Sequence, residues 1–123
     1  MKNIKTGERA FDLEERTVTF SEDCIKLCKE VNRDIVTIPL IKQFIRSATS
    51  IGANYCEADD AESKEDFHHK IGICKKESKE TMYWLRLLSN SIESEALKDK
   101  CRALWQESKE LSMIFAKIAL NTV

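Results

Sequence analysis

Glu65 and His68 are the residues whose types and spacing come closest to a metal site. Residues three apart on a helix lie on the same side, and a Glu-x-x-His pair supplies part of the ligand set in di-iron helical bundles. Such a site needs a second pair of this kind, yet the other histidine, His69, is turned by about 100° from His68. We therefore expect a solvated first helical turn and no metal site.

The cysteines offer little for catalysis or for disulfide formation. They are odd in number and contain no Cys-x-x-Cys pair: Cys24, Cys28, Cys56, Cys74 and Cys101. Cys24 and Cys28 lie one turn apart, but neither has the histidine or helix N-terminus that lowers a thiol pKa. With three glycines, the chain also lacks the glycine-rich loops of nucleotide-binding proteins. We expect reduced, mostly buried thiols, no catalytic residue and no cofactor.

Charged side chains are unevenly distributed, although the formal net charge is −1. Residues 57–69 carry six acidic residues against one lysine, whereas residues 70–123 carry ten basic residues against seven acidic ones. The acidic run 57–66 is either a solvated corner or a docking surface for a basic partner. The lysine band that would carry nucleic-acid binding comprises Lys70, Lys75, Lys76 and Lys79. Because no basic stripe dominates, nucleic-acid binding is the alternative function.

Apolar residues recur at alternating steps of three and four along most of the chain, which predicts helices at about 13–34, 39–61, 64–91 and 95–120. Asp12 with Glu15 and Ser63 with Asp66 resemble helix starts, and Thr37 or Ile38 is the expected cap before Pro39. The matched lengths predict an all-α fold, an antiparallel up-down-up-down four-helix bundle in one domain, 1–123. A long two-stranded coiled coil is disfavoured by the polar breaks near 35, 62 and 93.

Two features predict that copies of the chain associate. Gly52 lies among small residues, either for tight packing within one bundle or to receive side chains from another subunit. In MYWLRLL, residues 82–88, apolar side chains encircle the helix, which is more than one bundle covers. We therefore expect a homo-oligomer. The candidate interface residues are Gly52, Ala53, Tyr55, Tyr83, Trp84 and Leu87.

Four segments together resemble a known bacterial family: DLEERT (12–17), RSATSIGANYCEA (46–58), SKEDF (63–67) and KKESKETMYWLRLL (75–88). The resemblance is to the four-helix-bundle proteins named for the intervening sequences of 23S rRNA genes, and it covers residues 12–120. It implies a cytoplasmic homopentamer without enzymatic activity and without a settled role. The chain also resembles the accessory variability protein of diversity-generating retroelements, a pentameric barrel with a basic surface that engages nucleic acid and reverse transcriptase.

The sequence departs from that pattern just after the SIGANY segment. Where family members often have arginines, this chain has Cys56, Asp59 and Asp60. Acidic groups repel phosphate, so this departure weakens the expectation of nucleic-acid binding. No apolar run of signal-peptide or membrane-spanning length occurs, and we expect a cytoplasmic protein. The function predicted is a non-enzymatic, self-associating scaffold for a protein partner; the alternative is an accessory protein that acts with RNA or a reverse transcriptase.

Overall fold

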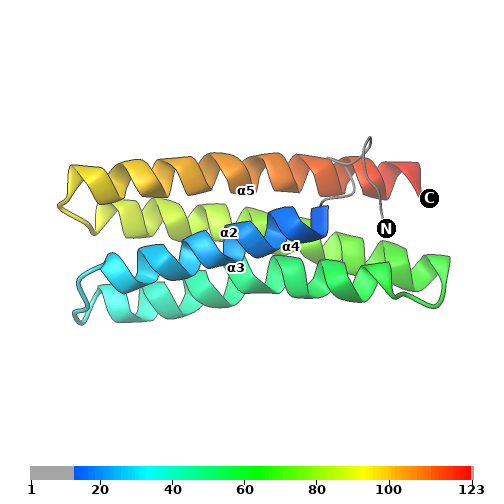
Figure 1. Cartoon of the computed structure of the whole chain (residues 1–123), viewed down its shortest axis with the longest axis horizontal. Helices are drawn as coiled ribbons and strands as arrows, with labels where there is room; N and C mark the ends of the chain where they lie inside the picture. Colours follow the sequence, from blue (N-terminus) through cyan, green and yellow to red (C-terminus); the bar gives the residue numbers. More distant parts are fainter. Residues whose placement is uncertain (1–12, 123) are drawn as a thin grey trace.

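The structure is a computed structural model that describes residues 13–122, and this part of the chain is helical throughout apart from the turns. The helices are α2 (Leu13–Glu30), α3 (Thr37–Asp59), α4 (Lys64–Asn90) and α5 (Glu95–Asn121). Figure 1 shows them side by side along the long axis of the molecule, with successive turns at opposite ends. The all-helical prediction with these helices is confirmed, and each helix lies close to its predicted position.

The helix boundaries on either side of the turn between α2 and α3 differ from the prediction. α2 ends at Glu30 rather than at Asp34, and α3 begins at Thr37 rather than at Pro39. The Asp34 carboxylate explains this, because its Oδ1 accepts from the backbone amides of Val36 (2.9 Å) and Thr37 (2.8 Å). The cap expected at Thr37 or Ile38 is therefore wrong; Val36 occupies that position without a side-chain cap. α3 also ends at Asp59, two residues earlier than predicted.

The starts of the last two helices follow the local capping rule. The backbone amide of Asp66 donates to Ser63 Oγ (3.0 Å), and that of Leu97 donates to Ser94 Oγ (3.2 Å). Each bond satisfies one of the amides that a helix leaves unpaired in its first turn. The predicted start at Ser63 is thereby confirmed, while Asp12 lies outside the described residues.

Large apolar side chains from all the described helices form the core, and the least exposed include Phe20, Phe44, Ile71, Leu85 and Phe115. Small polar residues are buried between these where helices meet closely. Thr81 of α4 donates to Ser47 Oγ of α3 (2.9 Å), and Ser108 of α5 donates to the Ser78 carbonyl oxygen of α4 (2.7 Å). These small side chains let the backbones of α3 and α5 lie close to α4. Because each hydroxyl has a hydrogen-bond partner, no polar group is left unpaired at these contacts.

Gly52 lies inside the bundle and faces α2. A Cβ atom at this position would lie 3.0 Å from Thr17 Oγ1 and 3.2 Å from Thr17 Cβ. Thr17 is itself buried and donates to the Glu14 carbonyl oxygen (2.8 Å). Close packing between α3 and α2 within one chain therefore accounts for Gly52, which is the first of the two interpretations of this glycine; its place in an intersubunit contact stays a prediction.

Candidate functional site

An exposed aromatic cluster lies on α4, within the segment that the sequence analysis identified. The Tyr83 side chain is 56% exposed, and its ring stands edge-on to that of the half-buried Trp84, with 5.0 Å between the ring centroids. Leu87, one turn further on, is also half-buried. We refer to Tyr83, Trp84 and Leu87 as the aromatic face. It is the part of the predicted interface that the structure brings together.

The indole of Trp84 is fixed by a polar network between α3 and α4. Trp84 Nε1 donates to Glu80 Oε2 (2.9 Å), and the same carboxylate pairs with Arg46 of α3. Arg46 also pairs with Glu77, with 3.3 Å between Nη1 and Oε1. The polar atom of the indole is therefore satisfied within the chain, so that further burial of the ring would leave no unpaired donor.

The remaining predicted interface residues lie apart from this face. The Tyr55 ring is half-buried against Phe115 of α5, with centroids 6.0 Å apart, and burial raises the pKa of its hydroxyl. Gly52 packs on α2, as described above, and Ala53 is exposed on α3. The predicted set thus divides into the aromatic face on α4, two residues that pack on other helices of the same chain (Gly52 and Tyr55), and the exposed Ala53.

Several exposed apolar residues were missed by the sequence analysis. Ile35 is 89% exposed in the turn between α2 and α3, and Val36 and Ile38 follow it. On α5, Met113 and Leu120 are also exposed. The β-branched run IVTIP was the available signal for the first group, but it was used only to place the start of a helix.

The predicted lysine band is divided by the fold. Lys70 pairs with Glu57 (2.6 Å), and this hydrogen bond raises the Lys70 pKa. Lys76 is exposed. Lys75 and Lys79 line a pocket of about 500 Å³ between α4 and α5, together with a third lysine, Lys109, from α5. The other side chains that line it are Met82, Ser112, Met113 and Ala116.

A second pocket, of about 280 Å³, lies between the same two helices. Its charged lining residues are Arg86 of α4 and Arg102 of α5, and Trp105 also lines it. The Lys109 ammonium group lies 5.6 Å from the centroid of the Trp105 ring, which links the two pockets. We call this surface the basic groove and define its cations as Lys75, Lys79, Arg86, Arg102 and Lys109. Sequence reasoning found only the first two of these.

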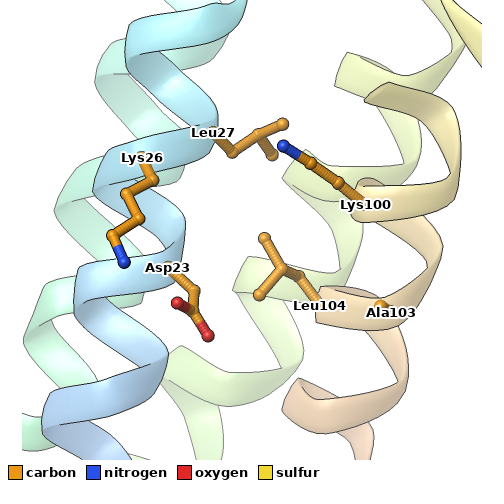
Figure 2. A pocket seen from close by; sticks show the side chains of 6 residues that line it. All are labelled: Asp23, Lys26, Leu27, Lys100, Ala103 and Leu104. Carbon is orange, nitrogen blue, oxygen red and sulfur yellow. The ribbon is translucent and has the colours of Figure 1, made fainter. Parts of the chain in front are cut away.

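The groove between α2 and α5 has a different character (Figure 2). A pocket of about 240 Å³ there is lined by apolar residues and by the mixed charges of Asp23, Lys26 and Lys100. Ion pairs join its two helices: Lys100 contacts Glu30 (2.8 Å), and Arg16 contacts Glu107 (2.6 Å). Oppositely charged side chains therefore compensate one another across this groove.

The acidic run 57–66 surrounds the turn between α3 and α4. Asp59, Asp60, Glu62 and Glu65 are exposed, while Glu57 is paired with Lys70. Within residues 13–122, no group of three histidine, cysteine, aspartate or glutamate side chains is close enough to hold a metal ion.

The thiols are free, and each has a raised pKa. Burial raises the pKa of Cys28 and Cys101 to about 11 and that of Cys74 to about 12, and it raises that of Cys24 further. Cys56 is exposed, yet partial desolvation and the nearby Glu14 carboxylate also raise its pKa. At neutral pH these groups are protonated, and a thiol in that form is a poor nucleophile.

Comparison with known proteins adds the family. The sequence matches the 23S rRNA-intervening sequence protein family over residues 9–117. The chain belongs to this family. It is also similar to the crystal structure of a protein of unknown function from the S23 ribosomal protein family of Bacteroides thetaiotaomicron. That structure has a TM-score of 0.74 and 31% sequence identity, and the match covers 86% of this chain and 96% of the other. No curated protein matches.

The resemblance to the 23S rRNA-intervening sequence protein family is thus confirmed, and so is the predicted all-helical fold. The match to the 23S rRNA-intervening sequence protein family includes both the aromatic face and the cations of the basic groove. For residues 13–122, no helix of this family member is both long enough and apolar enough to cross a bilayer.

Proposed function

We propose that this member of the 23S rRNA-intervening sequence protein family is a non-enzymatic, self-associating bundle, and that the aromatic face is buried between copies. One observation carries the proposal: Tyr83 is 56% exposed beside two half-buried apolar side chains on the outside of α4. Tyrosine and tryptophan are the residue types that contribute most to binding energy at interfaces.

The network around Trp84 supports this use of the surface. Because Glu80 already accepts from Trp84 Nε1, a second copy would bury the ring without the cost of an unsatisfied donor. Arg46 anchors that carboxylate from α3, so the indole is held in place before association. Preorganised side chains lose less conformational freedom on binding, which favours association.

The assembly that we propose is a cytoplasmic homopentamer, and the family resemblance is the support for that number. The protonated thiols and the mixed-charge groove between α2 and α5 support a role without catalysis. In this role the assembly is a scaffold on which a protein partner binds.

Analytical ultracentrifugation of Tyr83→Glu tests the proposal. A carboxylate in place of the ring would have to be buried without a partner, so we expect a smaller sedimentation coefficient than that of the wild type. Leu120→Glu is the matched control, because Leu120 is also exposed and lies on α5, away from the aromatic face. If both variants sediment like the wild type while circular dichroism shows intact helices, the aromatic face is not the contact surface.

A further inference from the structure

Ion pairs between α2 and α5 close the groove between these helices at both ends. Arg16 of α2 contacts Glu107 of α5 at one end, and Lys100 of α5 contacts Glu30 of α2 at the other. Residues 16 and 30 are separated by about 21 Å along α2, at 1.5 Å per residue. A groove of this limited length suits a small ligand better than a helix or a strand that continues past the bundle.

Two neighbouring pockets occupy the groove between these ion pairs. One is the pocket of about 240 Å³ in Figure 2, and the other has a volume of about 390 Å³. Both are lined by Asp23, Ala103 and Leu104, so they form one continuous site. Volumes of this order are typical of sites for small organic molecules.

The walls of this site are mostly apolar. Ala103 is exposed, and its short side chain leaves the surface of α5 open above the buried Leu104. Long basic side chains such as Arg16 and Lys26 add their methylene stems, because only the charged end of such a side chain needs water. A ligand with an alkyl chain would therefore be covered along its length.

Asp23 is the charged residue that both pockets share. It is exposed and takes no part in an ion pair within residues 13–122, unlike Arg16 and Lys100 at the ends of the groove. Figure 2 shows the Asp23 carboxylate directed into the space between the two helices, on the side of Leu104. A carboxylate placed beside apolar walls attracts a ligand that carries a positive charge on an apolar body.

We propose that this groove binds a primary alkylamine, with its ammonium group on Asp23 and its alkyl chain over Ala103 and Leu104. At neutral pH such an amine is protonated, as a lysine side chain is, and offers three hydrogen-bond donors. Thr19 supplies a second acceptor, because it lines the larger pocket and lies four residues before Asp23, on the same side of α2. The proposal goes beyond self-association and uses a different surface from the aromatic face.

A ligand of the opposite charge fits this groove less well. The Asp23 carboxylate would repel a fatty-acid carboxylate, and the cations Arg16 and Lys100 are already engaged with carboxylates of the chain. Lys26 has no ion-pair partner within the described residues, but its ammonium group lies over α2 in Figure 2 rather than between the helices.

Saturation-transfer difference NMR during a titration with octylamine tests the proposal. We expect transfer from the protein to the alkyl protons, and an affinity that falls by up to about fourfold for each methylene removed between octylamine and butylamine. Asp23→Asn keeps the shape of the side chain and removes its charge, so it should weaken octylamine binding about tenfold. Octanoate should bind more weakly than octylamine to the wild type.

Glu22→Gln is the matched control for the charge. Glu22 is exposed on the same helix and lines neither pocket, and its side chain is turned by about 100° from that of Asp23. We expect this control to bind octylamine within about twofold of the wild type. Ala103→Leu should fill the groove and weaken binding, whereas Ala96→Leu, at an exposed position outside it on α5, should not.

The proposal is overturned if no saturation transfer to octylamine occurs, or if octanoate binds as tightly as octylamine. It is also overturned if Asp23→Asn and Glu22→Gln weaken binding equally while circular dichroism shows intact helices. Tyr83→Glu separates this proposal from self-association. It should bind octylamine like the wild type whatever its mass in solution, and loss of binding in this variant would also contradict a site formed by α2 and α5 of one chain.

Discussion

Replacing Gly52 with alanine tests the packing between α2 and α3. Alanine favours a helix by about 1 kcal/mol over glycine, and an exposed site would show that gain. At Gly52, however, the new Cβ would lie 3.0 Å from Thr17 Oγ1, and forcing atoms into a packed core costs roughly 1–3 kcal/mol. The difference predicts that Gly52→Ala lowers the free energy of unfolding by about 1 kcal/mol, or Tm by about 4 °C.

Gly72 provides the matched control within the same protein. It is an exposed helical glycine on α4, and a Cβ built there has no neighbour within 4 Å. Gly72→Ala should therefore raise the free energy of unfolding by about 1 kcal/mol. The assay is urea unfolding followed by circular dichroism at one fixed protein concentration, because association shifts apparent stability. Equal stabilisation by the two substitutions would refute the close contact between Gly52 and Thr17.

Two further predictions concern the turn between α2 and α3 and the reactivity of the cysteine thiols. Hydrogen bonds from the backbone amides of Thr37 and Val36 lower the pKa of the Asp34 carboxyl group in the folded protein. The Asp34 carboxylate therefore stabilises the fold at pH values above its pKa in the unfolded chain, and this contribution is lost as the pH falls through its pKa in the folded protein. Asp34→Ala should therefore lower Tm at pH 7, and this loss should shrink as the pH falls below the ordinary aspartate pKa of about 3.9, measured by thermal melts; a loss that stays the same at acidic pH would contradict this. Under native conditions only Cys56 should react with a disulfide reagent, and slowly, while all the cysteines react in denaturant; rapid native labelling of more than one thiol would contradict their burial.

The sequence predicted those parts of the fold that depend on local rules. Ser63 was recognised as a cap because its partner, the Asp66 amide, lies three residues away, and the apolar spacing along α4 identified its buried side. The end of α2 was misplaced because the turn after Glu30 is fixed by the Asp34 carboxylate. Apolar periodicity carries no signal for that bond.

The sequence predicted the aromatic face but only part of the basic groove, and the reason is related. Tyr83 and Trp84 are adjacent in the chain, so the excess of apolar side chains around one helix was visible in the sequence. The basic groove joins Lys75 and Lys79 to Lys109, which is brought beside them only when α5 packs on α4. Gly52 was ambiguous for the same reason, since its partner Thr17 lies on another helix.

The most direct test of the central claim, that copies of the chain cover the aromatic face of one another, is the mass in solution. Light scattering at micromolar concentration should give a multiple of the 14.2 kDa chain mass, five times that value for the proposed pentamer, and a smaller multiple for Tyr83→Glu. A wild-type protein that scatters as a single chain would contradict the account.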